Sequence, residues 1–161
     1  MKKGQIIGQI FIYILAIILI AFVLGYGYKT IAAFRQKTEQ VSFIQFKTEL
    51  QNAVKTITTD FGSVKIKVFP VPGNYNKVCF VRSHESFPAI TSIFNNYPII
   101  RDSVEDNVEK NVFLIKNTAK DSFYVGKIVT SPDLYCVDVK NSAIKLRLEG
   151  KGNHVVISEA S

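Results

Sequence analysis

The sequence predicts an α+β protein in which a long N-terminal helix precedes a mainly antiparallel β head, built as a sandwich or a curled sheet. Three observations predict this layout. Residues 4–28 form a run of 25 residues without a charged side chain. Beyond this run apolar residues recur at helical steps, and from Ser63 onward they alternate with polar ones at a period of two. After a short basic start at 1–4, we expect an apolar helix at 5–28, an amphipathic continuation at 29–60 and a β head at 61–161.

The apolar run is long enough to cross a bilayer, because 25 residues of helix span roughly 37 Å at 1.5 Å per residue. A cleaved secretory signal has an apolar region of about 7 to 15 residues, so this run is too long for one. Tyr26 and Tyr28 follow at its end, where aromatic rings favour the membrane interface. The run is therefore interpreted as a retained membrane helix.

The helix is predicted to continue to about Thr59 because residues 29–61 contain neither proline nor glycine. A bend at Gly25 and Gly27 is allowed for, and residues 60–62 form the stop signal. We expect one apolar stripe along the continuation, which would pack on the head. Its members are Ile31, Phe34, Val41, Ile44, Leu50, Val54 and Ile57.

The head contains short apolar runs separated by turn residues, which is typical of an antiparallel sheet. Residues 85–110 interrupt these runs with a more helix-like, irregular segment that includes Pro88 and Pro98. The last pair of runs is expected to form a hairpin around Gly150 and Gly152. The runs lie at 64–68, 78–81, 112–115, 123–129, 134–139, 144–148 and 155–157.

The residues before the apolar run carry a family resemblance. Lys2, Lys3 and Gly4 abut the apolar helix without a spacer, and the stretch KKGQIIGQIFIYILAIILIAF resembles the class III signal of archaeal type IV pilin-like proteins. In that family a membrane-embedded prepilin peptidase cuts after the glycine and the helix stays on the mature protein. The resemblance thus implies that residues 1–4 are a leader, that cleavage falls between Gly4 and Gln5, and that 5–28 is a transmembrane or filament-core helix.

The resemblance also implies partners for the helix, namely copies of itself or related pilin-like subunits. Gly8 and Ala16 are small residues at which helices could approach closely. Family members commonly have glutamate at the fifth mature position, where this chain has Gln9, an uncharged group that still forms hydrogen bonds. Gly8, Gln9 and Ala16 are therefore the candidate helix-packing residues.

Cys79 and Cys136 both lie in apolar strand contexts. In an exported head these two residues would form one disulfide. Two buried free thiols are the alternative, because cysteine is common in protein cores.

The sequence offers little for catalysis, metals, cofactors or nucleic acids. Ser83, His84 and Glu85 are adjacent, whereas a catalytic triad is defined by positions in space, so we interpret His84 as a loop histidine. The two cysteines and two histidines lack metal-site spacing. The formal charge of +7 is spread along the chain rather than gathered on one stripe. We expect no enzyme activity, no cofactor, no metal, no small-molecule substrate and no nucleic-acid partner.

Four acidic residues at helical spacing are interpreted as a solvated face, namely Asp102, Glu105, Asp106 and Glu109.

The sequence thus favours a structural subunit, major or minor, of a type IV pilus-like surface filament that is stored in the membrane before assembly. Its helix would pass once through the cell membrane and its head would be extracytoplasmic. The alternative is a permanently anchored extracytoplasmic binding module of a cell-envelope complex.

Overall fold

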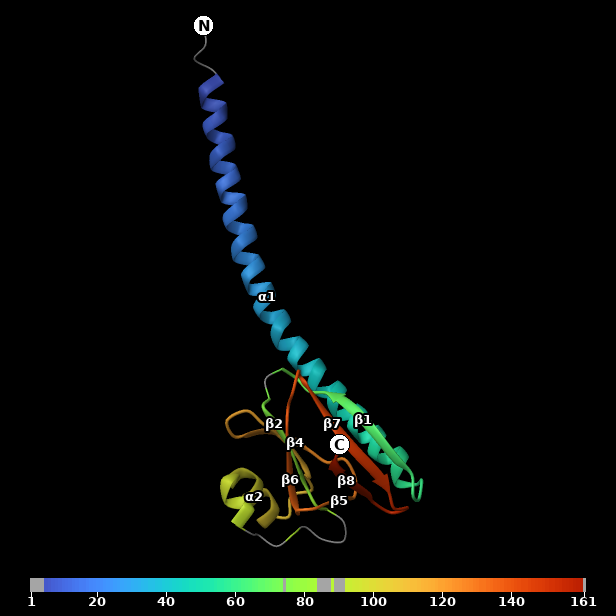
Figure 1. The fold of residues 1–161 in the computed structure, drawn as a ribbon. Helices are drawn as coiled ribbons and strands as arrows, with labels where there is room; N and C mark the ends of the chain where they lie inside the picture. The colour runs from blue at the N-terminus through green and yellow to red at the C-terminus, as the bar shows by residue number, and fades with distance from the viewer. Residues whose placement is uncertain (1–4, 74, 84–87, 89–91, 161) are drawn as a thin grey trace. The chain divides into compact units, whose positions relative to one another are not determined.

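The computed structural model describes residues 5–73, 75–83, 88 and 92–160, with side chains for all of these except 5–9, 32–33 and 35–36. The chain divides into two compact units, Met1–Gln40 and Val41–Ser161. An apolar N-terminal helix followed by sheets rich in antiparallel pairs gives the expected α+β layout (Figure 1). The second unit begins inside the helix, about twenty residues before the expected start of the head at residue 61.

The helix α1 runs from Gln5 to Thr58 without interruption at Gly25 or Gly27. It ends one residue before the predicted Thr59. The Thr58 hydroxyl donates a hydrogen bond to the Val54 carbonyl oxygen at 2.7 Å, and Gly62 then reverses the chain with a φ of 77°. This positive φ favours glycine and belongs to the turn that leads from the end of α1 into β1.

Two four-stranded sheets form the head. Sheet A has the order β1-β7-β8-β5 and sheet B the order β4-β3-β2-β6. Among the described residues only the pairing of β5 with β8 is parallel. The strands of sheet A are β1 (Val64–Pro70), β7 (Ala143–Gly150), β8 (Val155–Glu159) and β5 (Ile128–Thr130), and those of sheet B are β4 (Ala119–Phe123), β3 (Val112–Ile115), β2 (Lys77–Val81) and β6 (Leu134–Asp138).

One predicted strand is wrong. The apolar run 123–129 contains the end of β4 and the start of β5, which belong to different sheets. Gly126 lies between them with a φ of 111°, a conformation that interrupts a strand. The apolar pattern gave no sign of this change of sheet because both strand ends are buried.

The irregular segment between β2 and β3 contains the short 3-10 helix η1 (Ser92–Asn96) and the helix α2 (Pro98–Glu105). Pro98 begins α2, a position where its missing N–H is harmless. Pro88 is buried, and residues 84–87 lie outside the described part of the chain.

The main core lies between the sheets and the C-terminal part of α1. Phe46, Leu50, Val54 and Ile57 of the helix are buried against residues from both sheets. A second cluster covers the other face of sheet B, where Ile100 and Val104 of α2 and Phe94 of η1 pack on it. Strands β2 and β3 are therefore buried on both faces, which explains their continuous apolar sequences.

Candidate functional site

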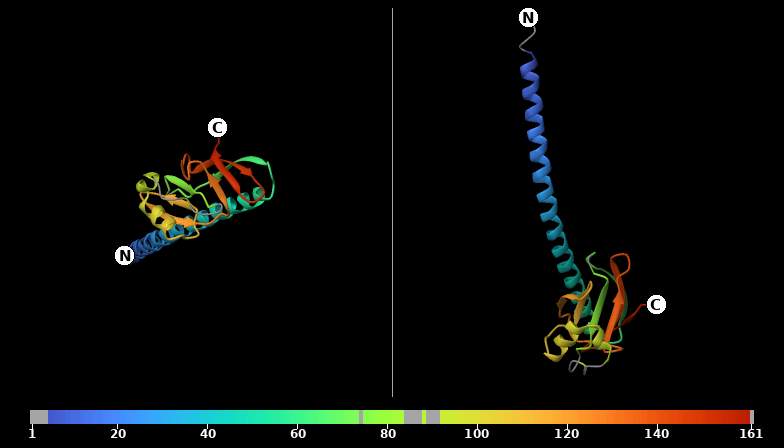
Figure 2. Two further views of the ribbon diagram at one scale, coloured as in Figure 1. Left: turned by 90° about the horizontal axis from the view of Figure 1, so that it is seen from below. Right: turned by 90° about the vertical axis from the view of Figure 1, so that its left-hand side faces the viewer.

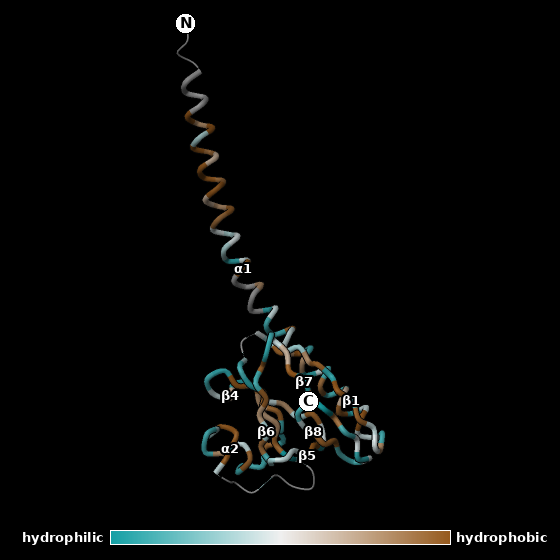
Figure 3. The backbone as a smooth tube through the Cα atoms, viewed as in Figure 1, coloured by the Kyte–Doolittle hydropathy of each residue, from teal (hydrophilic) through white to brown (hydrophobic). Residues whose placement is uncertain are grey.

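The first unit carries an apolar helical surface. Ile10–Ile31 is long and apolar enough to cross a membrane, with a mean hydropathy of 2.7 (Figure 3). Its large aliphatic and aromatic side chains are exposed. Exposed apolar side chains of this density are normally covered by lipid or by other helices.

The sequence-predicted processing and packing residues lie near the start of this helix. Gln5 is the first residue of α1, and Gly4 lies outside the described residues. Gly8 and Gln9 belong to α1, but their side chains lie outside the described part of the chain. Ala16 is half-buried between exposed neighbours. The structure therefore leaves the roles of these residues as predictions.

In the second unit α1 has two apolar faces rather than the single predicted stripe. Phe46 and Leu50 are fully buried against the head, whereas Val41 and Ile44 are 62 % and 59 % exposed. At about 100° per residue, Val41 and Ile44 point to the side of the helix that faces away from Leu50. The prediction of one stripe is wrong because the head covers only one of these faces. Of the predicted members Leu50, Val54 and Ile57 are buried, and Ile31, Phe34, Val41 and Ile44 are exposed.

Cys79 of β2 and Cys136 of β6 form a disulfide, with the two Sγ atoms 1.99 Å apart. The two residues are direct partners in the antiparallel register of these strands. The pairing expected from the sequence is therefore present, and it joins segments 57 residues apart in the chain. The disulfide fastens the edge strand β6 to the middle of sheet B.

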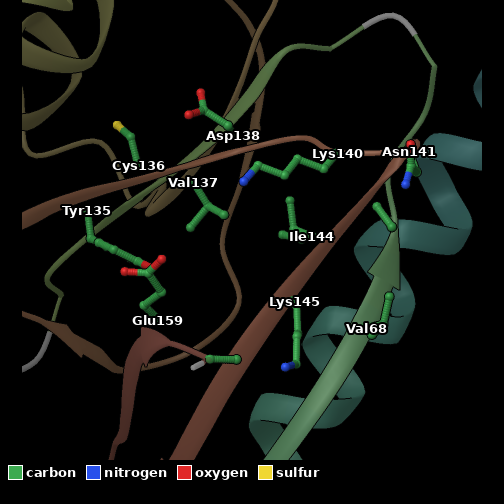
Figure 4. A pocket seen from close by; sticks show the side chains of 12 residues that line it. Val68, Tyr135, Cys136, Val137, Asp138, Lys140, Asn141, Ile144, Lys145 and Glu159 are labelled. Atoms are coloured by element: carbon green, nitrogen blue, oxygen red, sulfur yellow. The ribbon is translucent and has the colours of Figure 1, made fainter.

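A groove of about 590 Å³ lies beside the disulfide, between the edge of sheet B and one end of sheet A (Figure 4). Tyr135 and Val137 of β6 line one wall, and Ile144 of β7 lines the other. The burial of Tyr135, and then the nearby charge of Glu159, raise the pKa of the Tyr135 hydroxyl. The lining is mixed, because apolar side chains alternate with charged and polar groups such as Asp138, Lys145 and Glu159. Further lining residues are Val68, Cys136, Asp138, Lys140, Asn141, Ala143, Lys145 and Ala160.

A buried polar network holds the strand ends near Gly126, and it was not predicted from the sequence. The Asn111 amide nitrogen donates to the Ser83 hydroxyl and to the Gly126 carbonyl oxygen, both at 2.7 Å. The Asn111 side-chain oxygen accepts from the Val125 N–H at 3.0 Å, and Asn111 has no exposed surface. The only sequence signal was an asparagine directly before an apolar strand.

This network gives Ser83 a structural role. Its hydroxyl donates to the Gly126 carbonyl oxygen at 3.2 Å and accepts from the Ile128 N–H at 3.3 Å. His84 and Glu85 lie outside the described residues. The arrangement of these two residues relative to Ser83 therefore stays untested.

The other polar candidates are dispersed. His154 contacts Asn153 in the loop after β7. The acidic residues 102, 105, 106 and 109 are exposed in and after α2. In the part of the chain that the structure describes, no three His, Cys, Asp or Glu side chains gather closely enough to hold a metal ion.

Comparisons with family models, with curated proteins and with solved structures give no match to this chain.

Proposed function

We propose that this protein is a non-enzymatic structural subunit of a type IV pilus-like surface filament. The apolar helix α1 stores the subunit in the membrane, and assembly transfers the helix into a bundle with copies of itself or related subunits. The head faces the extracytoplasmic side. A prepilin peptidase removes residues 1–4 and leaves Gln5 as the first residue. This proposal rests on the sequence resemblance and on the second apolar face of α1.

The observation that carries the proposal is the exposure of Val41 and Ile44. These residues lie ten and thirteen residues beyond the end of the candidate span at Ile31. Lys37 and Glu39 precede them, and charged groups are costly in hydrocarbon. Lipid therefore does not explain an apolar face at this position, whereas packing between neighbouring helices does.

The disulfide supports the proposed location of the head. Disulfides persist in oxidising compartments outside the cytoplasm and are rare inside it. The bond between Cys79 and Cys136 is therefore compatible with a head that is exported and a helix that remains in the membrane.

A permanently anchored binding module is the second candidate, and the groove beside β6 favours it. The groove has a volume of about 590 Å³ and combines apolar with charged side chains, so it offers a concave surface to which a partner could bind. In this case the head would hold an envelope partner and α1 would stay in the lipid.

Shearing of native cells, followed by sedimentation of the released material, tests the filament. We expect wild-type protein in the pellet, and Val41→Ser combined with Ile44→Ser should shift it to the membrane fraction without unfolding the head. Phe61→Ser is the matched control, because Phe61 is an 82 % exposed apolar residue outside α1. If wild-type protein never leaves the membrane fraction, the anchored module replaces the filament subunit.

A further inference from the structure

We propose that the head also carries two complementary surfaces, and that the β1 face of one copy docks on the α2 face of the next copy. This inference rests on the proposed filament function and names the head contacts that accompany helix packing. The β1 face consists of Val64, Ile66 and Val68 with their neighbours on β7. The α2 face consists of Ile99, Asp102 and Asp106 with Val108 beside them.

The β1 face is apolar where an antiparallel sheet normally turns polar side chains to water. Val64, Ile66 and Val68 alternate along the edge strand and are 46 % to 57 % exposed. Their partners across the ladder are Glu149, Arg147 and Lys145, which lie on the same face of the sheet. The contrast between the two neighbouring strands shows that β7 faces water in the ordinary way, whereas β1 presents three adjacent aliphatic side chains.

The charge around the β1 face is positive. Glu149 accepts hydrogen bonds from Lys151 and from Arg147, the latter at 3.0 Å, and these partners lower the pKa of its carboxyl group. The single carboxylate is thus already neutralised by two cations. The bases on or beside this face are Lys145, Arg147 and Lys151, whereas Lys65 and Lys67 alternate with the aliphatic residues and point to the opposite face of β1.

Lysines on an edge strand disfavour pairing of β1 with a second β1, because like charges would meet. A symmetric β1 contact is therefore a poor solution. A complementary partner surface would combine apolar side chains, which cover the β1 residues, with carboxylates, which pair with the cations beside them.

The α2 face provides this chemistry. Ile99, Asp102 and Asp106 follow helical spacing on the side away from the buried Ile100 and Val104. Ile99 is 45 % exposed and Val108 is 37 % exposed, so apolar side chains lie among the acids. Residues 98–110 carry four acids against two bases, and one of these bases, Arg101, pairs with Glu105 at 2.9 Å.

The two faces lie on opposite sides of the head, as Figure 1 and the left view of Figure 2 show for β1 and α2. Contact between two different surfaces is heterologous, and heterologous contacts that do not close into a ring produce open helical filaments. The α2 face of a second copy therefore suits the β1 face, because it offers apolar side chains and carboxylates and lies on the opposite side of the head.

Cysteine cross-linking in native membranes and filaments tests the contact. The double variant Ile66→Cys with Ile99→Cys should give a ladder of cross-linked copies on mild oxidation, whereas each single variant should give none. Ile66→Cys with Lys120→Cys is the control, because Lys120 is exposed on β4, outside both faces. Abundant dimers of the Ile66→Cys single variant would indicate symmetric β1 pairing and overturn the proposal.

Charge exchange provides the second test. Lys145→Glu and Asp102→Lys should each lower the sheared, sedimentable protein about tenfold, because like charges across an interface are strongly unfavourable. The two substitutions together should restore it. If wild-type filaments form but the ladder is missing and the charge variants assemble normally, the docking proposal fails and the filament function stands. If wild-type protein forms no filaments, both proposals fail.

Discussion

Gly150 lies directly against Ile57, so that the last turn of α1 rests on the end of β7. A Cβ atom at Gly150 would come closer than 3.0 Å to the carbonyl oxygens of Ile57 and Asp60. The Gly150 carbonyl oxygen accepts from the Gly62 N–H at 2.8 Å, and its N–H donates to the Ser63 carbonyl oxygen at 2.9 Å. The backbone of the helix end and of sheet A therefore meet at a residue that has no side chain.

Gly150→Ala should destabilise the head, because the obstacle is backbone and cannot rotate away. Overpacking of this kind costs roughly 1–3 kcal/mol. Thermal or urea unfolding of the purified protein would measure the loss. Gly73→Ala is the control, since a Cβ there meets nothing within 4 Å, and equal stability of the two variants would contradict the prediction.

Asn111→Ala should lower the free energy of unfolding by about 1–3 kcal/mol or more, because it leaves buried partners without hydrogen bonds. The Val125 N–H and the Gly126 carbonyl oxygen are the groups affected. Asn96→Ala changes an exposed asparagine in η1 and should change stability little. A loss no greater than that of Asn96→Ala in urea unfolding would show that the network is dispensable.

The disulfide should protect Cys79 and Cys136 from alkylation until the protein is reduced. Closing a loop of 57 residues stabilises the head by about 4 kcal/mol in the chain-entropy model. Unfolding with and without reductant would measure this difference, and protein in which both cysteines are serine should not respond to reductant. Thiols that react in unreduced native protein would contradict the bond and weaken the argument for an exported head.

Processing should remove residues 1–4 and leave Gln5 at the amino terminus. The reason is the resemblance of the basic start and Gly4 to a prepilin peptidase site, since glycine lets an extended backbone enter a protease cleft. The intact mass of protein taken from the native membrane would decide the matter. Retention of Met1 to Gly4 would favour an uncleaved anchor.

Bulky substitutions in the apolar helix should block assembly but not membrane insertion. Gly8→Leu and Ala16→Phe place larger side chains where neighbouring helices would approach closely, whereas lipid accommodates these side chains. Gln9→Glu should be tolerated or improve assembly, because it introduces an acid that can pair with a new amino terminus. Shearing and sedimentation would compare these variants. Unchanged behaviour of all three would contradict helix packing.

Much of the fold could be predicted because local patterns reflect local burial. The helix end at residue 58 was predicted within one residue, since Gly62 is a strong stop signal. The hairpin of β7 and β8 followed from the glycines between them. The split of 123–129 could not be predicted, because a buried strand end looks the same in either sheet.

The sequence by itself determined the apolar helix, the β head and the presence of two cysteines in strands, because charge-free length and periodicity depend on neighbouring residues alone. Only the tertiary structure decided which helix face the head covers. Leu50 and Ile44 are both apolar and both fit a helical repeat, yet one is buried and the other exposed. The same holds for Val64, Ile66 and Val68 on β1, which are exposed while Phe69 of the same strand is buried, because long-range strand pairing decides which face of the strand turns toward the core. Burial of a side chain requires a partner surface, and the partners here are distant in the sequence.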